Sequence, residues 1–187
     1  MTEPPTEPPP RPVRRTVPSI VVVNTGDGKG KSSAAFGVAL RSLARDWRVA
    51  VVQFIKSGRW RTGEEAMLRR LGADWWALGD GFSWESDDLD ASRARAEAAW
   101  QHTAVVLAAG EHQMVVLDEI TYPMNWGWID TAEVVAAIRN RAPATNVVCT
   151  GRDAPELLRE LADTVTEMRK IKHAYDSGIM ARRGIEY

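Results

Sequence analysis

The sequence is most informative at Ile20-Val-Val-Val-Asn-Thr-Gly-Asp-Gly-Lys-Gly-Lys-Ser-Ser33, where a β-branched apolar run leads into a glycine-rich loop. The loop ends in Gly-Lys-Ser, and Ala34-Ala-Phe-Gly-Val-Ala-Leu40 follows as a helical pattern. A strand, a glycine loop, Gly-Lys-Ser and a helix, in this order, are the context that a phosphate-binding loop (P-loop) requires. Glycines let backbone N–H groups turn around phosphate oxygens, and the helix N-terminus adds partial positive charge.

This loop predicts a nucleotide site in which Lys31 carries positive charge to the phosphates and the Ser32 hydroxyl is a ligand of Mg²⁺. The usual pattern, Gly-x-x-x-x-Gly-Lys-Ser/Thr, has a glycine where this chain has Thr25, and the glycine follows one position later. The alternative is a glycine-rich turn with incidental lysines, which the flanking strand and helix patterns disfavour. The residues expected to line the nucleotide are Thr25, Gly26, Asp27, Gly28, Lys29, Gly30, Lys31, Ser32 and Ser33.

The composition indicates a globular chain without a strong overall charge. Its 187 residues are enough for one sizeable core, and 24 Lys and Arg residues nearly balance 25 Asp and Glu residues. This balance argues against nucleic acid as a partner. Cys149 is the only cysteine, which excludes an intramolecular disulfide, and no apolar run has the length of a membrane span or the form of a signal peptide. We therefore expect a cytoplasmic protein with no membrane partner.

Residues 1–18 differ from the rest, because they are rich in proline and poor in core-forming side chains. This composition predicts a disordered or extended tail over 1–18, followed by one P-loop domain over 19–187. A solvated tail fits, and so does a tail that orders over a ligand or a neighbouring subunit. In the second case Arg14 and Arg15 would meet phosphate or carboxylate groups.

Apolar runs alternate with helical patterns after residue 18, which predicts an α/β fold with a doubly wound, mostly parallel sheet and helices on both faces. Strands are predicted over 20–24, 49–55, 114–118, 146–150 and 164–168, and helices over 32–45, 64–71, 89–109, 131–140 and 155–161. Ligands of such sheets lie at the carboxyl ends of the strands. This rule selects 25–33, 56–60, 119–122 and 151–152.

Charged side chains stand at two more of these strand ends. Val115-Val-Leu-Asp-Glu119 is an apolar strand with an acidic pair at its end, and either Asp118 or Glu119 is placed to hold Mg²⁺ opposite Ser32. Arg152 follows the next strand, where its guanidinium would reach phosphate oxygens. A surface arginine in a turn fits the same position equally well.

Large aromatic side chains fall outside the clearest elements. Phe82 and Trp84 lie in Gly79-Asp-Gly-Phe-Ser-Trp-Glu85, where two glycines indicate a loop. They would form a platform for a flat, partly apolar ligand, although a loop anchored to the core by its aromatic residues is the simpler explanation. Six of the eight tryptophans lie in or near predicted loops, which favours a wide apolar cleft: Trp60, Trp75, Trp76, Trp84, Trp126 and Trp128.

Taken in order along the chain, the motifs resemble the ATP:corrinoid adenosyltransferases, a P-loop family that adenosylates cob(I)alamin or cob(I)yrinic acid a,c-diamide. The resemblance covers about residues 19 to 187, and it rests on Thr25-Gly-Asp-Gly-Lys-Gly-Lys-Ser-Ser-Ala-Ala-Phe-Gly37, Val51-Val-Gln-Phe-Ile-Lys56, Gly81-Phe-Ser-Trp-Glu85, Trp100-Gln, Val115-Val-Leu-Asp-Glu-Ile-Thr-Tyr122, Thr150-Gly-Arg152, Lys172-His-Ala-Tyr-Asp-Ser-Gly178 and Gly184-Ile-Glu-Tyr187. Asp27 stands where the family commonly has asparagine, and Ser32-Ser33 replace two threonines but keep the hydroxyl groups. The resemblance implies a P-loop, RecA-like architecture.

It also implies a transfer rather than a hydrolysis, in which Co(I) of the corrinoid attacks the 5′ carbon of ATP and triphosphate leaves. Lys31 and Mg²⁺ would stabilise the departing triphosphate, and Glu119 is the preferred member of the acidic pair for the metal. Phe82 and Trp84 would face the corrinoid and exclude a ligand from the lower face of cobalt. The implied partners are ATP, a corrinoid, an electron-donating flavoprotein reductase and a second copy of the chain in a homodimer.

The main alternative is a generic P-loop ATPase or kinase that acts at the γ-phosphate, and a third is a nucleotide-binding regulatory module without chemistry. Partitioning ATPases need a lysine where this chain has Gly26, which counts against that subclass. Within the transferase hypothesis, cobalamin, cobinamide and the a,c-diamide fit the motifs equally well.

Overall fold

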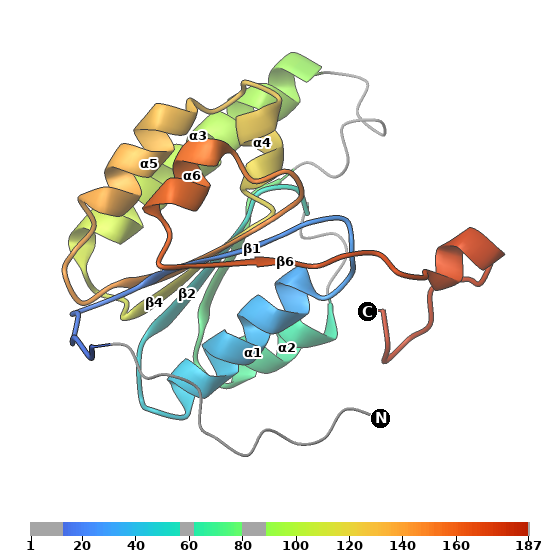
Figure 1. The fold of residues 1–187 in the computed structure, drawn as a ribbon, viewed down its shortest axis with the longest axis horizontal. Coiled ribbons are helices and arrows are strands. Elements are labelled where there is room, and N and C mark those ends of the chain that lie inside the picture. Colours follow the sequence, from blue (N-terminus) through green and yellow to red (C-terminus); the bar gives the residue numbers. More distant parts are fainter. Residues whose placement is uncertain (1–12, 57–61, 80–88, 187) are drawn as a thin grey trace.

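Six parallel strands make up the centre of the molecule, which the computed structural model describes over residues 13–56, 62–79 and 89–186 (Figure 1). The strand order is β3-β2-β4-β5-β1-β6, and every neighbouring pair is parallel. The predicted α/β class with a parallel, doubly wound sheet is confirmed. The strands are β1 (Val21–Thr25), β2 (Val49–Gln53), β3 (Asp74–Ala77), β4 (Met114–Asp118), β5 (Asn146–Thr150) and β6 (Thr164–Glu167).

Helices cover both faces of this sheet (Figure 1). One face carries α1 (Lys31–Leu43) and α2 (Gly63–Arg70). The other carries α3 (Leu89–Ala109), α4 (Thr121–Asn125), α5 (Thr131–Arg139) and α6 (Glu156–Leu161). Among these described helices none is long and apolar enough to cross a membrane.

The central strands are continuously apolar because helices cover both faces of the sheet. In β4, Val116 belongs to the core cluster that includes Phe36 of α1, whereas Leu117 belongs to the core cluster that includes Trp100 of α3. Successive side chains of a strand point to opposite faces, so a strand covered on both sides is apolar at every position. Because the strands are parallel, all their carboxyl ends meet at one edge of the sheet.

One strand and one α-helix were not predicted from the sequence. The edge strand β3 has four residues and pairs with β2, and its tryptophans do not line a cleft as expected. Trp75 is a core residue whose indole N–H donates to Gln53 Oε1 at 3.2 Å, and Trp76 packs edge-on against His102. The helix α4 occupies a stretch that we expected to be a loop.

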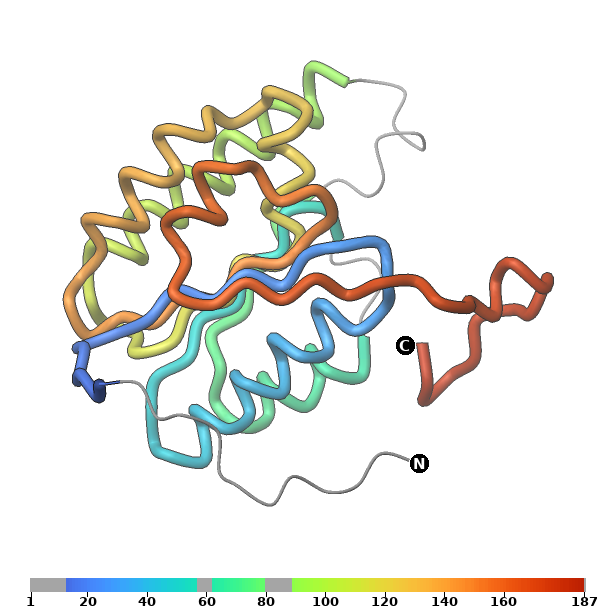
Figure 2. The backbone as a smooth tube through the Cα atoms, viewed as in Figure 1, coloured from blue at the N-terminus to red at the C-terminus, as the bar shows by residue number. Residues whose placement is uncertain are grey.

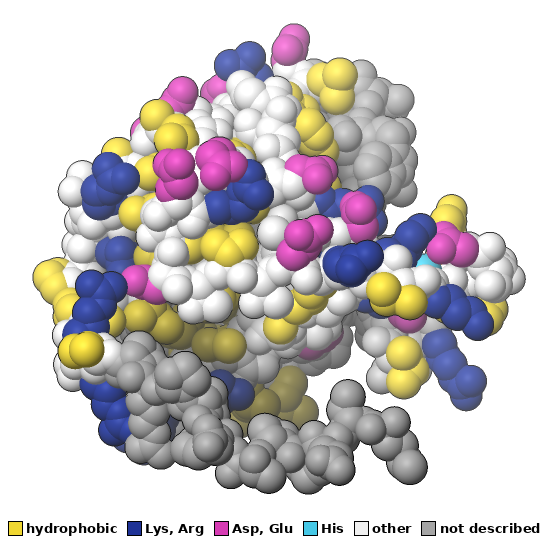
Figure 3. Space-filling model, viewed as in Figure 1, with side chains coloured by type: hydrophobic (Ala, Val, Ile, Leu, Met, Phe, Trp, Pro, Cys, Tyr) yellow, Lys and Arg dark blue, Asp and Glu magenta, His cyan; other side chains and the backbone are white. Residues whose placement is uncertain are grey.

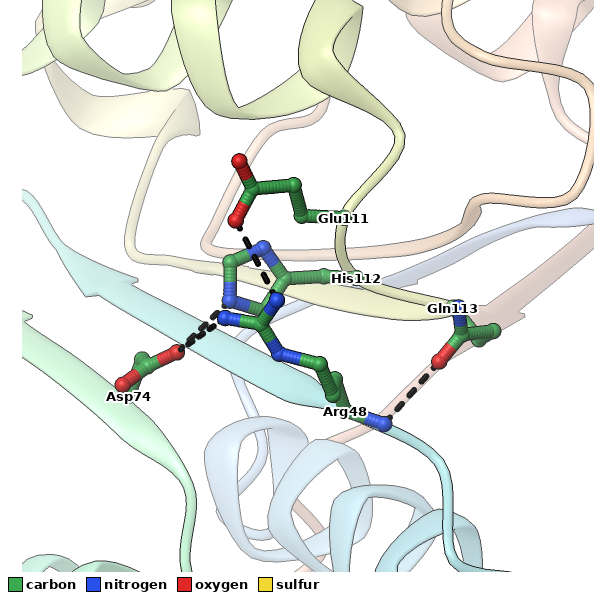
Figure 4. Close-up of polar contacts among 5 residues, drawn as sticks. All are labelled: Arg48, Asp74, Glu111, His112 and Gln113. Atoms are coloured by element: carbon green, nitrogen blue, oxygen red, sulfur yellow. Dashed lines mark hydrogen bonds and ion pairs between the residues drawn. The ribbon is translucent and has the colours of Figure 1, made fainter.

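A polar cluster holds the opposite edge of the sheet, at the amino ends of β2, β3 and β4 (Figure 4). His112 Nε2 lies 2.8 Å from Asp74 Oδ2, and the Arg48 guanidinium lies between Asp74 and Glu111. The Arg48 backbone N–H donates to Gln113 Oε1 at 3.0 Å. These contacts attach the edge strand β3 to its neighbours at the end of the sheet away from the glycine loop.

The chain segments before β1 and after β6 lie outside the sheet. Residues 13–18 form no helix or strand and are mostly exposed, and the rest of the expected tail, 1–12, lies outside the described residues. After β6 the chain leaves the body of the molecule next to the glycine loop (Figure 2) and forms a short 3₁₀ helix, η2 (Ala174–Ser177).

Candidate active site

The glycine loop connects β1 to α1 and packs against the chain that leaves β6. The Gly28 N–H donates to Met168 O at 2.6 Å, and a Cβ on Gly26 or Gly28 would stand only 2.6 or 2.7 Å from the same oxygen. Gly30 has a φ of 104° directly before the first helical residue, which is a left-handed conformation that favours glycine. The glycines are therefore required by the fold of the loop itself, as well as by the approach of phosphates.

Lys31 folds back over this loop, with its Nζ donating to Gly26 O at 2.7 Å and to Gly28 O at 2.6 Å. The backbone carbonyl of Lys31 accepts from the Asn24 side-chain amide at 3.2 Å, which ties the start of α1 to the end of β1. Burial, and after it the charge of Arg152, lower the pKa of Lys31. Both effects would be relieved by an anion placed among these groups.

The two acidic residues at the end of β4 lie in different environments. Asp118 is fully buried, and its two oxygens accept from the Gln53 amide at 2.9 Å and from the Thr150 hydroxyl at 2.8 Å. Glu119 has a φ of 66°, a left-handed conformation that is uncommon for a residue with a side chain, and its N–H donates to the same Thr150 Oγ1 at 2.9 Å. This turn separates the two carboxylates.

The Glu119 carboxylate is buried without a full set of partners. Its Oε2 has no hydrogen-bond partner among the described residues. Burial, and after it the charge of Asp118, raise the pKa of Glu119 to about 7, although Lys56, Lys31 and Arg152 act in the opposite direction. A buried carboxylate oxygen without a partner is costly, and a bound cation would remove that cost. Glu119 thus fits a cation ligand better than Asp118 does.

A pocket of about 440 Å³ brings most of the predicted site residues together. Thr25, Gly26 and Asp118 do not line it; the Thr25 hydroxyl accepts instead from the Ala154 N–H at 3.0 Å. Phe82 and Trp84 lie outside the described residues. The predicted residues that do line the pocket are Asp27, Gly28, Lys29, Gly30, Lys31, Ser32, Ser33, Glu119 and Arg152.

The same pocket is lined by Trp126, which the sequence placed in an apolar cleft, and by residues to which the sequence had assigned no role, among them Lys56, Tyr122, His173 and Glu186. The strand-end rule selected the positions of Lys56 and Tyr122 without giving them a function. Trp126 was expected in a loop, whereas it directly follows the short helix α4. His173 and Glu186 come from the segment after β6, whose position no periodic pattern reveals.

That C-terminal segment brings charge to the mouth of the pocket. Glu186 forms an ion pair with Lys29 of the glycine loop, and Lys170 pairs with Asp176 at 3.1 Å further out. Figure 3 shows basic side chains gathered on this segment, and its exposed basic residues are Arg169, Lys170, Lys172, Arg182 and Arg183. The Glu186 carboxylate is therefore paired with Lys29, a cation that would otherwise be available to a bound phosphate.

Comparison with known proteins identifies relatives of the whole domain. The family model of the ATP:corrinoid adenosyltransferases BtuR/CobO/CobP matches residues 18–187. The corrinoid adenosyltransferase of Escherichia coli K12 is 41% identical over 90% of this chain and 85% of that protein. The corrinoid adenosyltransferase of Pseudomonas aeruginosa is 44% identical over 90% of this chain and 83% of that protein. Among solved structures, the flagellar accessory protein FlaH from Methanocaldococcus jannaschii aligns with a TM-score of 0.49 at 14% identity, over 81% of this chain and 71% of that one.

The burial of Glu119 predicts a pH-dependent cost to folding. Its pKa is about 7 in the folded protein against an ordinary value of 4.5, so the folded state binds more protons between these values and loses stability as the pH rises through them. Glu119→Gln removes this titration. We expect the free energy of unfolding of the variant, relative to the wild type, to increase from about pH 5 to about pH 8. Urea denaturation without nucleotide at several pH values measures it, and parallel profiles for the two proteins would contradict the prediction.

The ion pair between Lys29 and Glu186 predicts competition with a bound nucleotide. Glu186→Gln frees Lys29 and should tighten ATP binding by about two- to fivefold, the range expected for a partly exposed ion pair. Isothermal titration calorimetry with Mg²⁺ and ATP gives the dissociation constant. Asp176→Asn is the matched control, since it removes the same charge from the same segment but away from the pocket. Equal affinities for Glu186→Gln and Asp176→Asn would show that Glu186 does not compete.

Proposed function

The chain belongs to the family of ATP:corrinoid adenosyltransferases, and we propose that it transfers the 5′-deoxyadenosyl group of ATP to Co(I) of a corrinoid and releases triphosphate. The observation that carries this proposal is the pocket in which the glycine loop, Lys31, Arg152 and Glu119 face one another. It offers cations and backbone N–H groups for a polyphosphate, together with a buried carboxylate for the accompanying metal.

The transfer is a displacement at carbon. The electron pair of Co(I) forms a bond to the 5′ carbon of ATP, the bond between that carbon and the triphosphate oxygen breaks, and its electrons stay on the oxygen. The nucleophile carries no proton, so the step needs no general base. The task of the protein is to position two substrates and to stabilise the negative charge that develops on the departing oxygen.

Side chains of the pocket are suited to this charge. Lys31 lies inside the glycine loop and exchanges its two backbone carbonyl partners for phosphate oxygens, while Arg152 approaches from the end of β5. Lys29 becomes available when Glu186 is displaced. Groups that are already oriented for the product charge need no rearrangement during the reaction, which is the main source of such stabilisation.

Ser32 and Glu119 would hold Mg²⁺ at this site. Both line the pocket, the Ser32 hydroxyl is a standard ligand of the metal in phosphate loops, and the unpartnered oxygen of Glu119 fits a cation. The ion would supply positive charge to the phosphates when bound. Asp118 has both oxygens occupied by Gln53 and Thr150, and it positions the strand end.

Further residue roles and partners follow from the family resemblance. Phe82 and Trp84 would exclude a lower ligand from cobalt, which makes Co(II) easier to reduce to Co(I). A flavoprotein reductase supplies the electrons, and the active form is a homodimer.

One assay separates this function from the alternatives. The purified protein is given ATP, Mg²⁺, cobalamin and a strong chemical reductant, and the products are examined. Adenosyl transfer yields a light-sensitive Co–C bond and intact triphosphate in equal amounts. ADP and phosphate without a cobalt adduct would identify a γ-phosphate enzyme, and no turnover would indicate a regulatory module.

The phosphate loop supports a direct test by substitution. Lys31→Ala should lower the transfer rate by about 10²–10³-fold, because one preorganised charge contact to the leaving group is lost. Lys170→Ala is the control, since it removes a lysine that does not line the pocket. Near-normal transfer by Lys31→Ala would reject the assignment of the loop.

Ser32 offers a finer test because a variant can keep its hydroxyl. Ser32→Ala should raise the Mg²⁺ concentration needed for half-maximal transfer, whereas Ser32→Thr should leave it close to the wild-type value. Mg²⁺ titrations of the transfer rate measure both. If all three titrations coincide, the Ser32 hydroxyl does not hold the metal.

A further inference from the structure

A row of buried polar residues crosses the sheet at the carboxyl ends of four neighbouring strands, β2, β4, β5 and β1. In the register of the sheet Gln53 stands beside Asp118, and Asn24 stands beside Thr150. Each of these residues is at most 6% exposed. Burial of a polar side chain is costly unless its hydrogen bonds are satisfied, so an apolar residue would be the default at each position. Packing alone therefore does not account for the row.

The hydrogen bonds along this row run in one direction. The Trp75 indole N–H donates to Gln53 Oε1 at 3.2 Å, and the Gln53 amide nitrogen donates to Asp118 Oδ2 at 2.9 Å. An indole N–H can only donate, so the reversed orientation of the amide would place two donors against each other. The Thr150 hydroxyl accepts from the Glu119 N–H at 2.9 Å and gives its single proton to Asp118 Oδ1 at 2.8 Å. Asp118 is thereby held from two sides.

The first donor of this chain of bonds is itself fixed. Trp75 is 3% exposed, its ring packs against Phe36 of α1 with the centroids 5.2 Å apart, and its carbonyl accepts from the Arg69 guanidinium at 2.7 Å. Arg69 also donates to Glu65 Oε1 at 3.0 Å. The direction of the Gln53 amide is therefore set by packing between α1, α2 and the edge strand β3.

We propose that Gln53 is a positioning residue for adenosyl transfer, whose amide fixes the acidic turn after β4 and thereby holds the Glu119 carboxylate at the phosphate pocket. This inference rests on the proposed function, in which Glu119 holds the metal. Gln53 does not line the pocket, and it acts through the bonds of Asp118 and Thr150. Glu119 has a φ of 66°, a conformation that costs free energy for a residue with a side chain and persists only where its surroundings hold it.

Substitution of Gln53 by methionine tests this role in a measurement that needs no corrinoid. Gln53→Met keeps the length of the side chain but has no N–H, so Asp118 loses one of its two donors and is free to turn away from Thr150. When EDTA removes the metal, we expect calorimetry to give a dissociation constant for ATP within about twofold of the wild-type value. With Mg²⁺ the variant should bind ATP about tenfold more weakly, the loss expected when a residue that orients a metal ligand is removed.

The chain of bonds can also be tested from its first donor. Trp75→Phe keeps an aromatic ring against Phe36 but removes the indole N–H that orients Gln53. It should weaken ATP binding with Mg²⁺ by about two- to fivefold, less than Gln53→Met, because the amide that donates to Asp118 is still present.

A double-mutant cycle shows whether Gln53 acts through Glu119. Glu119→Gln should remove most of the gain in ATP affinity that Mg²⁺ brings, and addition of Gln53→Met should then cause no further loss. Two losses that multiply would overturn the proposal. Wild-type affinity in Gln53→Met, or in Trp75→Phe if the first variant does not fold, would overturn it too, as would an ATP affinity of the wild type that does not depend on Mg²⁺.

Thr103→Val is the matched control. Thr103 is fully buried in α3 and does not line the pocket, and its hydroxyl donates to Ala99 O at 2.8 Å, so the variant also loses a buried hydrogen bond. Its ATP affinity should equal that of the wild type with and without Mg²⁺, and a loss as large as that of Gln53→Met would overturn the proposal. Failure of the wild-type protein to adenosylate cobalamin would instead reject the proposed function, so the two failures are distinguishable.

Discussion

The hydroxyl group of Thr150 fixes both acidic residues of the site from the strand that lies between them and the glycine loop. The glycine loop follows β1 and the acidic pair follows β4, and β5 lies between these two strands. Thr150, the last residue of β5, donates to Asp118 and accepts from the Glu119 N–H. This pair of hydrogen bonds holds Glu119 in its left-handed conformation and directs its carboxylate toward the loop. The strand pairing fixes β4 relative to β1, and the Thr150 hydroxyl extends that order beyond the ladder to the two acidic residues.

The pocket contains both cationic and anionic side chains in unfavourable surroundings, which suits two ligands of opposite charge. Burial, and after it the charge of Arg152, disfavour the charged form of Lys31 and lower its pKa. Glu119 has an oxygen without a partner and shares its surroundings with the Asp118 carboxylate. A polyphosphate would relieve the cations, and a divalent cation would relieve the carboxylate, so each ligand would favour binding of the other. The unfavourable surroundings of Lys31 and Glu119 in the free protein fit this proposed coupling.

How much of this could be read from the sequence differs between elements. The glycine loop, Glu119 and Arg152 were predicted because each follows a strand with a strong apolar signal, and strand ends converge in a parallel sheet. The edge strand β3 was missed because four residues between glycines carry too little pattern, and because two adjacent tryptophans suggested a loop. Glu186 could not be predicted, since its contact with Lys29 joins segments far apart in the chain and no periodicity places the segment after β6.

The short helix α4 also could not be predicted from the sequence. Its five residues are too few for a helical period, and Pro123 within it argues against a helix interior, so the sequence indicated a loop. Its attachment comes instead from Thr121 and Asn125, which bond to the carbonyls that follow β5. Such tertiary contacts give the molecule a second fixed surface beside the phosphate loop, aromatic where the first is charged. A displacement between two large substrates needs its binding groups in one rigid frame. The edge where the carboxyl ends of β1, β4 and β5 meet supplies that frame.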